Sequence, residues 1–155
     1  MTNEMSNSFE YIHLNDIDPN FAPIETGVYS LQLKELKRRV YFYKADHPSV
    51  IAGDVAEGEV KGDRITSRCV ITDHPELSGR QVWNTLWPNQ STFKALRRLA
   101  DATGIIQDDE EGFDAWLQRV EEEAPRFKCL VRNKQKGNDI ETSVDFFQVQ
   151  PADED

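Results

Sequence analysis

Cationic and aromatic side chains alternate along one stretch of this sequence in a pattern that suits the binding of a polyanion. Lys37, Arg39, Tyr41 and Tyr43 occur at every second position, so in an extended strand all four would lie on one face. Cations bind phosphate groups, and exposed rings stack on bases, each stack contributing ~1–3 kcal/mol. This face is therefore a candidate surface for single-stranded nucleic acid.

Later parts of the chain supply further candidates of the same two types. Arg64 and Arg68 would extend the cationic track on a neighbouring strand. Trp83 and Trp87 are additional candidates for stacking, although aromatic side chains more often fill a protein core. Both interpretations of these two rings stay open at this stage. The last hairpin would be lined by four bases, which are Lys128, Arg132, Lys134 and Lys136.

Residues that could carry catalysis or hold a metal are sparse. The three histidines are scattered, at His13, His47 and His74, and none has a Cys or carboxylate at a metal-ligand spacing. The nearest enzyme-like pattern is Glu59-Val60-Lys61 downstream of Asp46 and Asp54, which loosely imitates the acid-x-Lys arrangement of metal-dependent nucleases. Such triplets arise by chance in charged chains. We therefore expect a protein that is not an enzyme and has no metal or cofactor, with a nuclease kept as an alternative.

The formal net charge of −10 is distributed unevenly along the chain. Residues 1–25 hold five acids and no Lys or Arg, residues 105–124 hold eight acids and one base, and residues 151–155 hold three acids. Bases outnumber acids by twelve to nine over residues 26–104 and by five to three over residues 125–150. A polyanion responds to local potential. The total charge therefore does not exclude a nucleic-acid partner.

Hydrophobic periodicity predicts five strands and two helices. The first strand opens at Gly27, and its alternation slips by one residue at Glu35-Leu36, as a β-bulge would cause. The remaining strands are predicted over 64–72, 80–87, 126–134 and 140–150. One helix is predicted from a cap at Ser91 or Thr92 to Gly104 and another over 113–123, with a loop or loose hairpin over 44–63. Phe93 is expected on the buried stripe of the first helix.

The order of three strands, a helical insertion and two strands is that of a five-stranded OB-like barrel with a helix after strand 3. We therefore expect a mainly β, α+β fold, with an acidic N-terminal arm over 1–25, an OB-like domain over 26–150 and an acidic C-terminal tail over 151–155. Cys69 and Cys129 lie in separate strand-like runs, which favours free buried thiols in a reducing compartment. No apolar run is long enough for a membrane span. The expected location is the cytoplasm, without membrane association.

Several of these elements together resemble a family of phage-encoded single-stranded DNA-binding proteins long known only as a domain of unknown function. The similarity lies in Gly27-Val28-Tyr29 with its alternating strand, in ITSRCVITDHPELSGRQVWNTLW over 65–87, in the helix ending at Gly104 and in the late hairpin. It covers about residues 25–150 and implies an OB-like fold and a role in phage or plasmid DNA replication or recombination. The sequence departs from the family in its acidic insert over 45–63.

The sequence thus favours a protein that coats single-stranded DNA by phosphate contacts and stacking. Its acidic ending is similar to the tails of bacterial and phage single-strand binders, which implies replication or recombination proteins as partners. The alternative is an acidic protein-interaction module, or a DNA mimic that inhibits a host protein, acting through residues 105–124 and the tails. The oligomeric state stays open, a homo-oligomer included.

Overall fold

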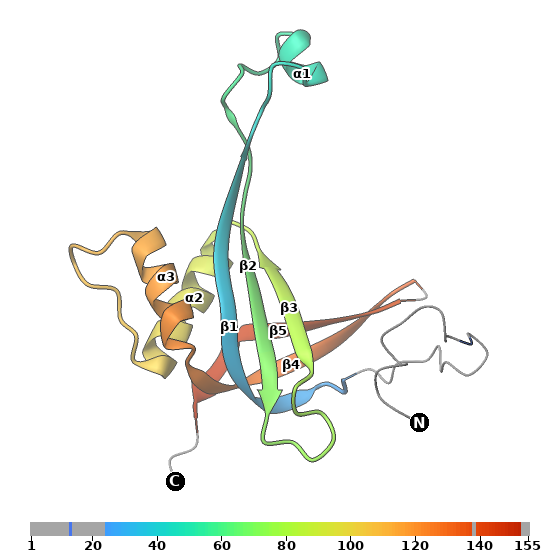
Figure 1. Cartoon of the computed structure of the whole chain (residues 1–155), viewed down its shortest axis with the longest axis vertical. Coiled ribbons are helices and arrows are strands. Elements are labelled where there is room, and N and C mark those ends of the chain that lie inside the picture. The colour runs from blue at the N-terminus through green and yellow to red at the C-terminus, as the bar shows by residue number, and fades with distance from the viewer. Residues whose placement is uncertain (1–12, 14–23, 138, 153–155) are drawn as a thin grey trace.

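The structure, a computed structural model, describes residue 13, residues 24–137 and residues 139–152 (Figure 1). Most of the predicted N-terminal arm and the last three residues of the predicted tail lie outside this range. The elements follow in the order β1 (Gly27–Phe42), α1 (Pro48–Ile51), β2 (Val60–Thr72), β3 (Gln81–Leu86), α2 (Gln90–Thr103), α3 (Phe113–Glu123), β4 (Arg126–Lys136) and β5 (Asp139–Pro151). No helix in the described ranges is both long and apolar enough to cross a membrane.

The five strands form one antiparallel sheet in the order β3-β2-β1-β4-β5. The predicted mainly β class, with helices between the third and fourth strands, is confirmed. The backbone ladder does not close into the predicted barrel, because β3 and β5 are the two outer strands. These strands meet through Asn84, whose side-chain amide donates to the Val144 carbonyl at 2.6 Å and accepts from the Val144 N–H at 2.8 Å.

A bulge bends β1 between two partner strands. The register with β2 shifts between Leu33 and Glu35, so Lys34 has no cross-strand partner there. The shift keeps Leu36 on the same side as Leu33, and both side chains are buried. The slip predicted from the sequence is confirmed. The first half of β1 pairs with β4 and the second half with β2 alone.

The core lies between the sheet and the two longer helices, with α2 packed against β5 and α3 against β1 (Figure 1). Helix α2 is capped by Asn89, whose Oδ1 accepts from the Thr92 N–H at 2.9 Å, and not by Ser91 or Thr92 as predicted. Its buried stripe begins at Thr92 and continues through Leu96 and Leu99. Phe93 falls at the margin of this stripe and is 48% exposed, so its predicted burial is wrong.

The second half of β1 and the beginning of β2 extend beyond the core as a two-stranded arm with α1 at its tip (Figure 1). Of the two predicted possibilities over 44–63, a loop or a loose hairpin, the structure shows the hairpin, although helix α1 and the pairing of residues 60–63 with β1 were not predicted. Val60 to Asp63 pair with β1 by backbone hydrogen bonds, which the hydrophobic pattern does not record. Helix α1 depends on a local cap, because the His47 side chain accepts from the Ser49 N–H.

Candidate nucleic-acid interface

The predicted residues of β1, β2 and β3 share one outward-facing surface. Ile65, Ser67 and Cys69 are buried, so the alternate residues of β2 point away from the core. Cross-strand partners then place the rest: Arg39 lies opposite Arg64, Lys37 opposite Thr66, and Arg68 between Glu35 and Trp83. We call this surface, formed by the outward residues of the three strands from Glu35 to Tyr41, Gly62 to Arg68 and Trp83 to Thr85, the outer face.

Two arginine–aromatic pairs lie on the outer face. The Arg64 guanidinium lies 5.1 Å from the centre of the Tyr41 ring and donates to the Tyr41 hydroxyl at 3.0 Å. The Arg68 guanidinium lies 5.6 Å from the centre of the Trp83 ring and donates to Glu35 at 2.9 Å. Cation–π contacts of this kind hold ring and charge together at a surface. Tyr41 is 43% exposed and Trp83 52% exposed, so neither ring is a core residue.

Positive charge on the outer face is concentrated where Arg39 and Arg64 lie directly opposite one another. Like charges at directly opposed positions of an antiparallel pair destabilise it. Arg39 makes no ion pair within the described ranges, and the buried Nε of Arg64 has no hydrogen-bond partner there. An anion bound between the two guanidinium groups would offset their repulsion and accept a hydrogen bond from the Arg64 Nε.

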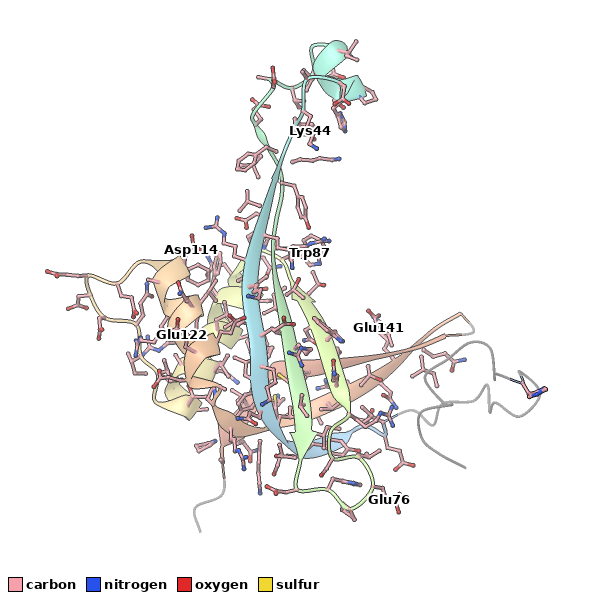
Figure 2. All side chains as sticks on the ribbon, in the orientation of Figure 1. Lys44, Glu76, Trp87, Asp114, Glu122 and Glu141 are labelled. Atoms are coloured by element: carbon pink, nitrogen blue, oxygen red, sulfur yellow. The ribbon has the colours of Figure 1, made fainter. Side chains whose placement is uncertain are left out.

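A hollow of about 1110 Å³ lies beside this arginine pair at the base of the arm. Tyr41, Arg64 and Trp87 line it, and Trp87 is 54% exposed. Figure 2 shows Lys44 on the arm and Trp87 at the arm's base. Phe42, Lys44 and Lys61 are among the lining residues that were not predicted.

These three residues were missed for two reasons. Lys44 and Lys61 lie in the predicted loop or loose hairpin. The alternation of β1 predicts that Phe42 points into the core with Leu36, but this end of β1 lies in the arm, beyond the core (Figure 1). Phe42 is 54% exposed. Only the pairing of residues 60–63 with β1 would have pointed to these residues. The hydrophobic pattern of the sequence does not reveal this pairing.

Lys37 and Tyr43, the two ends of the predicted alternating row, have partners away from the arginine pair. The Lys37 amine lies 3.3 Å from a Glu121 carboxylate oxygen on α3. The Tyr43 ring is half-buried and packs edge-on against His47 at the beginning of α1, with 4.8 Å between ring centres. The structure therefore brings Arg39, Tyr41 and Arg64 together. Tyr43 lines the same hollow as Tyr41 and Arg64 but packs on His47, and Lys37 is paired with α3.

The four bases predicted on the last hairpin belong to β4, and the three whose side chains are described do not join the outer face. The β4–β5 hairpin and the β1–β2 arm point in different directions (Figure 1). Arg132 binds Asp145 at 3.0 Å, Lys134 lies opposite Glu141, and Lys128 lies opposite Gln150 and Ser30. The side chain of Lys136 lies outside what the structure describes.

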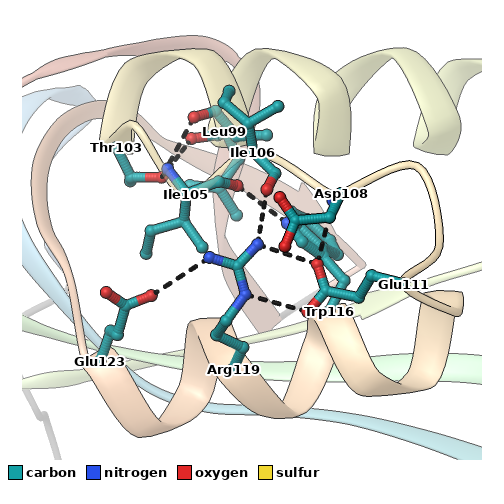
Figure 3. A network of polar contacts seen from close by, with 10 residues as sticks. Leu99, Thr103, Ile105, Ile106, Asp108, Glu111, Trp116, Arg119 and Glu123 are labelled. Carbon is teal, nitrogen blue, oxygen red and sulfur yellow. Dashed lines mark hydrogen bonds and ion pairs between the residues drawn. The ribbon is translucent and has the colours of Figure 1, made fainter.

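Acids of the predicted connector over 105–124 hold the fold together. Arg119 of α3 donates to both Glu111 oxygens, at 2.9 and 2.8 Å, and to the Ile106 carbonyl (Figure 3). Hydrogen bonding by Arg119 lowers the pKa of Glu111. The Trp116 indole donates to the Ile105 carbonyl at 2.8 Å in the same network. The loop before α3 is thus fastened to the helix that follows it.

Glu121 explains the acids at the C-terminal end of α3, a place that the helix dipole disfavours. Its carboxylate accepts from the Leu36 N–H at 3.0 Å and from the Lys37 amine at 3.3 Å. The Leu36 N–H lies on an edge of β1 that faces α3, beyond the last residue that pairs with β4. The Glu121 carboxylate therefore stabilises the edge of β1 and does not stabilise the helix to which it belongs.

Metal-ligating groups and thiols are the other candidates for chemistry in the described residues. In the part of the chain that the structure describes, no three His, Cys, Asp or Glu side chains are grouped so that they could hold a metal ion. Burial raises the pKa of both thiols, that of Cys129 to about 12. A buried protonated thiol is a poor nucleophile.

No protein-family model matches the sequence, and no curated protein matches it. The geometry of the outer face and of the hollow at the base of the arm therefore carries the functional interpretation.

Proposed function

We propose that this protein binds single-stranded DNA on the outer face and in the hollow at the base of the arm, with little sequence preference. The carrying observation is the set of exposed rings beside arginines on adjacent strands, with Tyr41 against Arg64 and Trp83 against Arg68. Binders that tolerate any sequence combine cations for the phosphates with rings on which the bases stack. Arg39 and Arg64, which form no ion pair within the described ranges, supply the first and the exposed rings supply the second.

The same proposal includes an OB-like fold. In an OB barrel the helix follows strand 3, and oligonucleotides bind on strands 2 and 3 and on the loops after strands 1 and 4. Here α2 and α3 follow β3, the outer face includes β2 and β3, and the arm follows β1. Asn84 joins β3 to β5, the two strands between which the backbone ladder is missing. These features support the OB-like interpretation.

The biological setting in this proposal is DNA replication or recombination of a phage or plasmid, in the host cytoplasm. It rests on the sequence resemblance alone, as does the recruitment of replication or recombination proteins by the acidic ending. The protein acts as a coat and not as an enzyme.

The alternative of an acidic protein-interaction module receives less support. Glu111, Asp114, Glu121 and Glu123, four of the eight acids over 105–124, form ion pairs with bases of the same chain. A DNA mimic needs its acids free to contact the partner's cationic surface. In the test below, this alternative predicts that oligonucleotides do not bind at all.

Fluorescence anisotropy with a labelled oligo-dT tests the proposal. Replacing Tyr41 or Trp83 with Ala should weaken binding by ~1–3 kcal/mol, the value of one stacked base. Replacing Arg39 or Arg64 with Ala should lower the dependence of log K on log salt by about one each. Arg97→Ala is the matched control, because Arg97 is exposed on α2 and paired with Asp101, and it should change nothing. Wild-type affinity weaker than about millimolar at low salt would refute the proposal, since even non-specific DNA binding is tighter than that.

A further inference from the structure

A second, smaller hollow continues from the base of the arm toward the helices. It has a volume of about 310 Å³, at the lower end of the ~300–1,000 Å³ usual for small-ligand pockets. Its aromatic lining consists of Trp87, Phe93 and Phe113, with Ile65 and Leu86 completing the apolar walls. We call it the Phe93 pocket. It shares Asp63, Arg64 and Trp87 with the larger hollow, so the two are neighbours.

The rings of this pocket are left exposed without an explanation in the fold. Phe93 is 48% exposed and Trp87 54% exposed, although both are large apolar side chains that gain free energy on burial. Phe113 is held from behind by Trp116, with ring centres 6.1 Å apart and planes tilted by only 27°. Two exposed rings and one fixed ring thus line a single concavity, where a flat ligand would bury all three.

The charged groups at the rim of the pocket balance one another. Arg38 donates to both Asp63 oxygens, at 2.9 and 2.7 Å, and lies 3.3 Å from Asp114. Its hydrogen bonds lower the pKa of Asp63, which keeps the ion pair intact near neutral pH. A phosphate gains little from a cation that already holds two carboxylates. An uncharged ring suits this pocket better, while phosphates suit Arg39 and Arg64 next to it.

We propose that the Phe93 pocket takes one unstacked nucleobase of the strand bound on the outer face. This inference rests on the proposed function and deepens it, because it extends the path of the strand from the arm, past Arg64 and Trp87, toward α2. Arg64 lines both hollows. A phosphate at Arg64 therefore has one neighbouring nucleotide beside Tyr41 and the other at the Phe93 pocket. The path leads away from the β4–β5 hairpin.

Substitutions at Phe93 test the pocket in the full-length protein. Phe93→Ala and Phe93→Leu both remove the aromatic face, and Leu keeps most of the apolar volume. Each should weaken oligo-dT binding by about 5- to 150-fold, the equivalent of one lost base stack, while Phe93→Trp should bind at least as well as wild type. Ile106→Ala is the control, because Ile106 is 49% exposed and lines a neighbouring hollow that shares Phe93 and Phe113, but it does not line the Phe93 pocket itself. It should bind like wild type.

Photo-crosslinking supplies a second readout that does not depend on affinity. Oligonucleotides carrying one 5-iodo-deoxyuridine at successive positions should crosslink to Phe93 or Trp87 from one position, and to Tyr41 from a neighbouring position. If wild type binds oligo-dT but both Phe93→Ala and Phe93→Leu bind within twofold of it, with no crosslink to Phe93, the pocket is refuted and the proposed function stands. If wild type binds no oligonucleotide, the proposed function itself fails.

Discussion

Asn84 joins the two outer strands of the sheet, and its replacement by Ala should destabilise the whole domain. The substitution removes both hydrogen bonds to Val144, each worth about 1 kcal/mol net. Val144 is 3% exposed, so water replaces these bonds only in part, which adds roughly 1 kcal/mol for the backbone groups left unpaired. We expect a loss of about 2–3 kcal/mol in the free energy of unfolding, or about 4–12 °C in Tm for a chain of this size.

Urea denaturation followed by circular dichroism measures this loss, and amide exchange at Val144 measures it locally. Thr85→Ala is the control, because Thr85 is the next residue of β3 and is exposed. Asn84→Asp should cost more than Asn84→Ala at neutral pH, since a carboxylate oxygen would then face the Val144 carbonyl. A loss below about 0.5 kcal/mol in Asn84→Ala, within the range of ordinary surface substitutions, would refute the view that this side chain joins the strands.

Three further predictions concern the reactivity of the thiols, the end of helix α2 and the loss of folding stability at low pH. Because burial raises the pKa of Cys69 and Cys129, an aromatic disulfide reagent at pH 8 should react with them only in denaturant, and rapid reaction of the folded protein would contradict this. Gly104→Ala should cost about 1 kcal/mol in urea denaturation, because this residue has φ of 74° and open space around it, which leaves only the left-handed backbone penalty. Glu111 has a lowered pKa in the folded state, so its contribution is present above its unfolded pKa of about 4.3 and is lost as the pH falls through the folded value. The free energy of unfolding of Arg119→Gln should therefore fall less than that of wild type between pH 7 and pH 3. Equal losses would show that the Glu111–Arg119 pair does not contribute to the loss of stability at low pH.

The order of strands and helices along the chain and the bulge in β1 could be predicted because both leave a mark in the hydrophobic pattern. A change of side-chain alternation at Glu35-Leu36 can arise only from a slip in the strand, and the buried Leu36 shows its result. The α2 cap was misassigned by two residues because Asn89, Ser91 and Thr92 can all accept a hydrogen bond from a helix N-terminus. Which of the three residues caps the helix depends on where its first turn begins, and the sequence pattern does not show this.

The missing parts of the candidate site depend on contacts between distant residues. The arm is a pairing of backbones over 60–63, where one apolar residue among four gives no periodicity. Phe93 has helical spacing with Leu96 and Ala100, so pattern alone assigns it to the core. The buried stripe begins instead at its neighbour Thr92. The Arg39–Arg64 pair could be suggested from the sequence, but placing the two directly opposite requires the register.

The hydrogen bonds that α3 and its following turn make to β1 have a consequence for self-association. Beyond Gln32 the strand has no β4 partner, and its next edge donors are satisfied by the Pro125 carbonyl, at 3.0 Å from the Leu33 N, and by the Glu121 carboxylate. An uncovered strand edge is a template on which another chain can add a strand. Loss of the Glu121 carboxylate would expose such a template on an otherwise folded molecule, so aggregation of native protein, and not unfolding, would be its first symptom.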